Sequence, residues 1–70
     1  MLLDVYGRRV LVRRERGAWC AYYPGNEGKR RLAGDITIPS DLAAGEVIRF
    51  VADLCHEWAT PARSRVRRLD

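Results

Sequence analysis

The sequence predicts an α+β fold: two consecutive hairpins give a three- to four-stranded antiparallel sheet, and one C-terminal helix packs on one face of it. Two observations lead to this class. Short runs of strand-forming residues separated by glycine turns fill residues 2–23. Apolar residues then recur every three or four positions over residues 44–58, which is the helical period. With 70 residues the chain has room for one core. We expect a single domain over residues 1–61 and a basic C-terminal tail over 62–70.

Turn-forming residues set the limits of the predicted strands. Gly7-Arg8 suits a type II′ hairpin turn, because glycine occupies its first central position. Arg16-Gly17 separates the second strand from a third that is rich in aromatic residues, and residues 24–28 carry strong turn chemistry. The predicted strands are residues 2–6, 9–15 and 18–23, part of 29–33, and a short apolar segment, 36–38, that ends at Pro39.

The helix is predicted from about Ala44 to Trp58, with charged residues on the face opposite the apolar one. Ser40 or Asp41 is placed to cap its start, and Pro61 to stop it. The apolar face that we expect to pack on the sheet consists of Val47, Phe50, Val51, Leu54 and Trp58.

Two-residue hairpin loops fix which strand residues share a face. They place Val5 opposite Val10 and Val12 opposite Ala21. Because side chains alternate across a strand, one face is apolar enough to receive the helix. This predicted inner face comprises Leu3, Val5, Val10, Val12, Trp19, Ala21 and Tyr23.

The reverse face mixes apolar, aromatic and charged residues, and a single helix cannot cover both sides of a sheet. We therefore expect this face to be solvated, covered by the tail, or buried against a partner. Small domains often supplement a thin core by associating with a second copy. A homodimer is the preferred interpretation, and another protein partner is the next. The candidate partner surface consists of Tyr6, Arg9, Leu11, Arg13 and Tyr22, within a face that also carries Leu2, Asp4, Glu15 and Cys20.

The net charge of +4 is distributed unevenly along the chain. A basic first half and tail flank an acidic segment over residues 39–61. Single-stranded nucleic acid is therefore an alternative ligand, since arginines follow phosphates and Tyr22 could stack on a base. No known nucleic-acid-binding signature accompanies these residues. The tail could also form an edge strand at residues 65–67, on this chain or a neighbour. The candidate polyanion contacts are Lys29, Arg30, Arg31, Arg63, Arg65, Arg67 and Arg68.

Catalytic, metal and cofactor motifs are not found in the sequence. Cys20 and Cys55 are 35 positions apart and fit no metal-binding spacing, so we expect two small buried thiols rather than a disulfide. His56 and Glu57 are helix neighbours that point in different directions. We expect no enzyme and no cofactor. No apolar run is long enough for a membrane span and no secretion signal is visible, which predicts a cytoplasmic protein.

Several short motifs are spread along the chain. They are Val5-Tyr6-Gly7-Arg8, Trp19 with Tyr22, Gly28-Lys29-Arg30-Arg31, Ile38-Pro39-Ser40-Asp41-Leu42, and His56-Glu57 followed by Pro61. Together they resemble one protein family, which comprises short bacterial proteins of about this length that are catalogued only as a domain of unknown function. The resemblance spans nearly the whole chain, implies a stand-alone bacterial protein, and brings no activity, cofactor or site residue.

Overall fold

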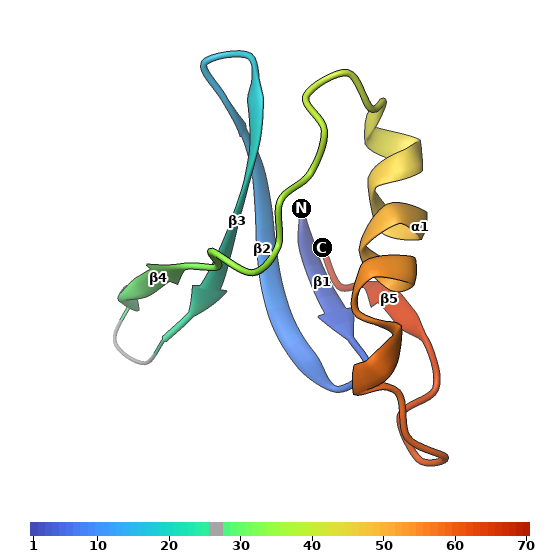
Figure 1. Cartoon of the computed structure of the whole chain (residues 1–70). Coiled ribbons are helices and arrows are strands. Elements are labelled where there is room, and N and C mark those ends of the chain that lie inside the picture. Colours follow the sequence, from blue (N-terminus) through green and yellow to red (C-terminus); the bar gives the residue numbers. More distant parts are fainter. Residues whose placement is uncertain (26–27) are drawn as a thin grey trace.

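The computed structural model describes residues 1–25 and 28–70 and confirms the α+β class (Figure 1). Within these residues, five antiparallel strands form one sheet in the order β4-β3-β2-β1-β5. One α-helix and one short 3₁₀ helix lie between β4 and β5 in the chain. The elements are β1 (Leu2–Val5), β2 (Arg8–Glu15), β3 (Ala18–Pro24), β4 (Arg30–Leu32), α1 (Ala44–Leu54), η2 (His56–Trp58) and β5 (Val66–Arg68).

The core lies between the sheet and a layer formed by α1 and the connecting segment 33–43 (Figure 1). The indole Nε1 of Trp19 on β3 donates a hydrogen bond to the Leu42 carbonyl at 2.9 Å, which ties this segment to the sheet. The predicted inner face is confirmed, with Trp19 and Tyr23 at its margin. The buried residues are Leu3, Val5, Tyr6, Val10, Val12, Ala21, Ala33, Ile36, Ile38, Val47, Val51 and Cys55.

The first hairpin turns at Tyr6-Gly7, one position earlier than predicted. Both residues have positive φ, 52° and 92°, which is the pattern of a type I′ turn and not of the predicted type II′ turn at Gly7-Arg8. Leu3 therefore faces Val10, where the sequence predicted Val5. The register moves by two residues, an even number, so each side chain stays on its predicted face.

The second hairpin has the predicted register, with Val12 opposite Ala21. The following part of the chain differs from the prediction, because residues 36–38 do not pair as a strand. Ile36 and Ile38 instead extend across the inner face as buried anchors of the connecting segment. The predicted turn at 24–28 includes residues 26 and 27, which lie outside the described residues.

Helix α1 begins at Ala44 as predicted, but neither Ser40 nor Asp41 caps it. The N-cap is Ala43, whose backbone N–H donates to the Glu46 carboxylate at 3.0 Å. The α-helix ends at Leu54, four residues before the prediction.

The chain tightens at this end of the helix into the 3₁₀ turn η2, in which the Trp58 N–H bonds to the Cys55 carbonyl at 2.8 Å. The buried face follows the i, i+4 positions Val47, Val51 and Cys55. Leu54, predicted to be in the core, is 44% exposed.

The basic tail supplies the fifth strand of its own chain. Strand β5 pairs antiparallel with β1, and Val66 lies opposite Val5. Beyond it, the Leu69 N–H donates to the Leu2 carbonyl at 2.8 Å. The expected edge strand thus forms within the chain, shifted by one residue from 65–67, and brings the two termini together (Figure 1).

The Tyr23 hydroxyl at the margin of the core donates to the Asp35 carboxylate at 2.7 Å. Burial, followed by this hydrogen bond, raises the pKa of Tyr23 to about 12. A raised pKa means that the associated stabilisation is complete below the unfolded value of about 10 and is lost as pH rises through about 12.

We expect Tyr23→Phe to remove the most alkaline step from a tyrosinate absorbance titration of the folded protein. Stability should accordingly fall less steeply above a pH of about 10 in the variant than in the wild type. A final step that remains near a pH of 12 in Tyr23→Phe would contradict this assignment.

Candidate functional site

The face of the sheet away from α1, called the open face below, carries an apolar row that crosses every strand. Cross-strand pairing places Tyr22 between Leu32 and Leu11, and Leu11 opposite Leu2. Leu69, just past β5, continues the row through its backbone bond to Leu2. Leu32 is 65% and Leu69 42% exposed. The apolar row is Leu32, Tyr22, Leu11, Leu2 and Leu69.

Charged residues border the apolar row on both sides, and most of them are paired within the chain. On one side, Asp4 lies between Arg9 and Arg67 in the strand register, and Arg67 Nη2 contacts Asp4 Oδ2 at 3.1 Å. On the other side, Arg13 Nε lies 3.9 Å from Glu15 Oε2. The open face is thus an amphipathic surface with a central apolar line and a mainly basic rim.

Tyr22 is held in place by two neighbours on the open face. Its hydroxyl donates to Glu15 at 3.0 Å, and this hydrogen bond, followed by burial, raises the pKa of Tyr22. The Arg30 guanidinium lies 4.6 Å from its ring centroid in a cation–π contact. One side of the ring is therefore already covered by an arginine of the same chain.

Four of the five predicted partner-surface residues, Arg9, Leu11, Arg13 and Tyr22, lie together on the open face. Tyr6 does not, and its assignment to this surface was wrong. Its positive φ in the turn directs the ring to the helix side, where the hydroxyl donates to the Ala52 carbonyl at 2.8 Å. The ring also meets His56 edge-on, with the centroids 6.2 Å apart.

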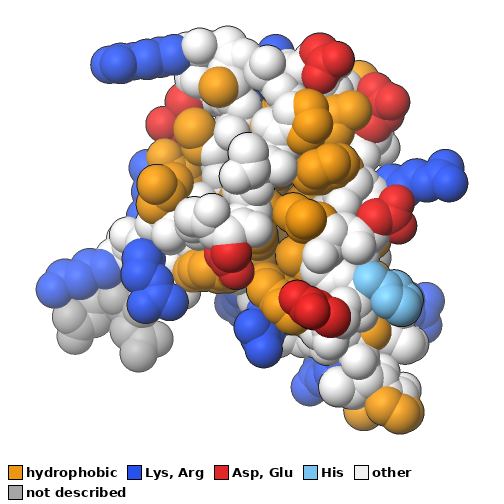
Figure 2. Space-filling model, in the orientation of Figure 1, with side chains coloured by type: hydrophobic (Ala, Val, Ile, Leu, Met, Phe, Trp, Pro, Cys, Tyr) orange, Lys and Arg blue, Asp and Glu red, His pale blue; other side chains and the backbone are white. Residues whose placement is uncertain are grey.

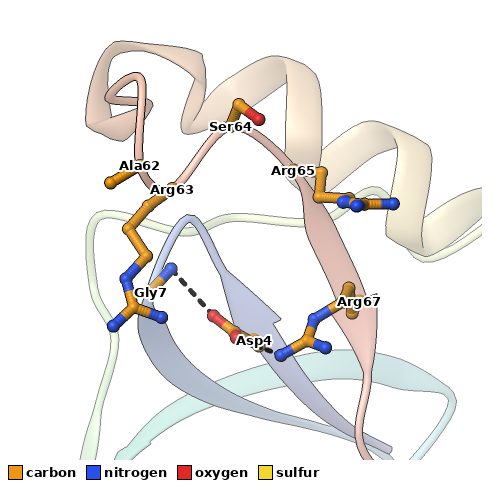
Figure 3. A pocket seen from close by; sticks show the side chains of 7 residues that line it. All are labelled: Asp4, Gly7, Ala62, Arg63, Ser64, Arg65 and Arg67. Atoms are coloured by element: carbon orange, nitrogen blue, oxygen red, sulfur yellow. Dashed lines mark hydrogen bonds and ion pairs between the residues drawn. The ribbon is translucent and has the colours of Figure 1, made fainter.

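The predicted polyanion contacts separate into two groups at opposite edges of the sheet. Lys29, Arg30 and Arg31 lie at β4 and the other four at β5, roughly 19 Å away across four strand spacings. Even the adjacent residues Arg30 and Arg31 lie on opposite faces of the sheet, because Arg31 lies over the Tyr23 ring. At the β5 edge, Arg63, Arg65 and Arg67 line a small surface pocket (Figure 3), while Arg68 pairs with Asp70 at 3.0 Å.

The helix side of the molecule has the opposite charge. Acidic side chains gather along α1 and η2 (Figure 2), and Glu46, Asp53 and Glu57 are exposed there. The two large surfaces of this small domain therefore differ in both charge and covering. The helix side is acidic and lies over the core. The open face is basic at its rim, and the apolar residues Leu32 and Leu69 are exposed on it.

The described residues contain no group of three metal-ligating side chains. Both cysteines are free. Cys55 is buried, and burial raises the pKa of its thiol, whereas Cys20 is half-exposed on the open face and not buried as predicted. Within residues 1–25 and 28–70, no helix is long and apolar enough to cross a membrane.

Comparisons with known proteins give a family and no further relative. No curated protein and no solved structure matches the chain. The family described as "Domain of unknown function (DUF7661)" matches residues 1–70. Because this match covers the whole chain, the resemblance found in the sequence is confirmed, and the chain belongs to the DUF7661 family.

Proposed function

We propose that this chain is a non-catalytic interaction module that forms a homodimer by packing its open face against that of a second copy. The observation that supports this most is the apolar row that runs from Leu32 on β4 to Leu69, just past β5. Leu32 and Leu69, the two ends of the row, are among the most exposed large hydrophobic residues of the described chain. Large exposed apolar patches on small domains mark interaction surfaces.

The size of the open face fits a reversible dimer. Five strands about 4.8 Å apart, with a mean length of about 16 Å, give a footprint on the order of 400 Å² per copy. Two such faces cover about 800 Å², which is the size of a weak, reversible interface. We therefore expect dissociation in the micromolar range.

Sedimentation equilibrium of the full chain tests the proposal. We expect the apparent mass to rise from 8.0 kDa toward twice that value as the concentration increases from about 1 to about 500 µM. A mass that stays at 8.0 kDa over this range would refute self-association.

Nucleic acid is the second candidate, and the basic rim of the open face is the observation that favours it. Arg30 already covers the Tyr22 ring, which reduces the aromatic surface left for base stacking. A labelled single-stranded oligonucleotide at low ionic strength separates the two ideas. Binding that weakens steeply with salt and competes with dimer formation would replace the homodimer with the nucleic-acid alternative.

A further inference from the structure

A pocket of about 330 Å³ opens at the β5 edge, between the Tyr6-Gly7 turn and the segment that leads into β5 (Figure 3). Its walls carry three arginines, Arg63, Arg65 and Arg67, together with the Asp4 carboxylate. The volume is at the lower end of the range for small-molecule sites, which is roughly 300–1,000 Å³.

Arg63 is held at both its backbone and its side-chain stem. Its backbone N–H donates to the Thr60 Oγ1 at 3.1 Å within a short turn. The stem packs on Gly7, where a Cβ atom would lie 3.2 Å from both Cγ and Cδ of Arg63. Gly7 thus leaves the space that this side chain uses. The guanidinium is then directed toward the pocket beside Asp4 (Figure 3).

Asp4 orients the opposite wall of the pocket. Its carboxylate accepts hydrogen bonds from Arg67 at 3.1 Å and from the Gly7 N–H at 2.8 Å. These contacts, the one from Arg67 first, lower the pKa of Asp4. Figure 3 shows Arg63 and Arg67 pointing toward Asp4 from two sides, and Arg65 pointing away from it. Asp4 is therefore ionised at neutral pH and fixes Arg67.

The pocket keeps a surplus of positive charge. Three arginines and one carboxylate line the pocket, and among the described residues the Arg63 and Arg65 side chains form no hydrogen bond or ion pair. Two uncompensated guanidinium groups match a ligand of charge −2. Guanidinium is also the side-chain group best suited to hold phosphate oxygens, because its planar fork donates two parallel hydrogen bonds.

We propose that the β5-edge pocket binds the dianionic phosphate group of a small phosphate ester. Arg63 and Arg65 supply the charge, Arg67 is positioned by Asp4, and the remaining volume accommodates the organic part of the ester. Arg63 and Arg65 are not part of the apolar row, so variants at these two residues test the pocket separately from the proposed homodimer.

Titration of the full chain by NMR tests the proposal, with glycerol 3-phosphate as the ligand and glycerol as its uncharged control. We expect saturable shifts at the amides of Gly7 and Ser64 with glycerol 3-phosphate and none with glycerol. Affinity should rise as the pH increases from about 5.5 to about 7.5, because the phosphate loses its second proton near a pH of about 6. Shifts that are absent or do not saturate would overturn the proposal.

Matched variants distinguish this pocket from diffuse positive charge. We expect Arg63→Gln and Arg65→Gln each to weaken glycerol 3-phosphate binding about tenfold, which is the effect of one lost charge-assisted hydrogen bond. Arg49→Gln on the helix removes the same charge and should leave binding within about twofold. An equal loss of glycerol 3-phosphate affinity in Arg63→Gln, Arg65→Gln and Arg49→Gln would refute a specific site.

A second pair of ligands tests the source of the phosphate. A short oligonucleotide with a 5′-phosphate should bind no better than glycerol 3-phosphate, and the same oligonucleotide without it should not bind in the pocket. Equal shifts from both oligonucleotides at Gly7 and Ser64 would assign the arginines to a phosphodiester backbone and overturn the proposal. Sedimentation of Arg63→Gln should match the wild type, so that failure of this site is distinguishable from failure of the homodimer.

Discussion

Leu3→Ala should come close to unfolding the protein. Leu3 is 0% exposed on the inner face of β1, opposite Val10 and between strands β2 and β5. Truncation of such a leucine costs about 2–5 kcal/mol, because the transfer free energy is lost and a cavity remains. A domain of 70 residues has only about 4–10 kcal/mol of unfolding free energy. We expect the melting temperature to fall by more than about 10 °C, measured by circular dichroism.

Leu54→Ala is the matched control for this prediction, because it makes the same chemical change in a residue that is 44% exposed on α1. Its unfolding free energy should stay within about 0.5 kcal/mol of the wild type, and alanine is a good helix former. Equal losses in Leu3→Ala and Leu54→Ala would show that the sheet face assigned to the core is wrong.

Leu11→Glu should abolish self-association while leaving the fold intact. Leu11 is at the middle of the apolar row, between Tyr22 and Leu2, and its neighbours Arg9 and Arg13 on the same face favour a carboxylate in the monomer. In the dimer the same carboxylate is buried against apolar groups, which costs about 2 kcal/mol or more. The dissociation constant should therefore rise about 30-fold or more, measured by sedimentation equilibrium.

Leu54→Glu introduces the same charge outside the proposed interface and should leave the dissociation constant within about twofold of the wild type. If Leu11→Glu has a lower melting temperature as a monomer, Leu32→Glu at the exposed end of the row provides the same test. An unchanged dissociation constant in Leu11→Glu or Leu32→Glu, with folding intact, would exclude the open face as the interface.

The inner and reverse faces of the sheet follow from the sequence because side chains alternate strictly along strands. The prediction survived an error of two residues in the first register, since an even shift preserves the face. It failed at Tyr6, because residues inside a turn do not alternate. The identity of that turn depends on whether Tyr6 adopts positive φ, which tyrosine rarely does and which its packing against Ala52 and His56 supports here.

Features that depend on contacts between distant parts of the chain could not be predicted. The apolar row requires β4 and the tail to dock at opposite edges of the sheet, and the sequence did not show that Leu32 and Leu69 would continue one row. The phosphate pocket likewise combines Asp4 and Gly7 with arginines more than 50 positions away. The alternation in Arg65-Val66-Arg67 and the apolar residues Val66 and Leu69 indicated that the tail docks, but they did not indicate which chain would receive the strand.

The reactivity of Cys20 measures the covering of the open face most directly. Cys20 is half-exposed beside the apolar row, whereas Cys55 is buried with a raised thiol pKa and serves as an internal unreactive reference. We expect alkylation of Cys20 in the wild-type chain to slow as the protein concentration increases through the dissociation constant, and to stay fast at every concentration in Leu11→Glu. A Cys20 rate that is independent of concentration in a protein that does dimerise would place the interface elsewhere and contradict the account.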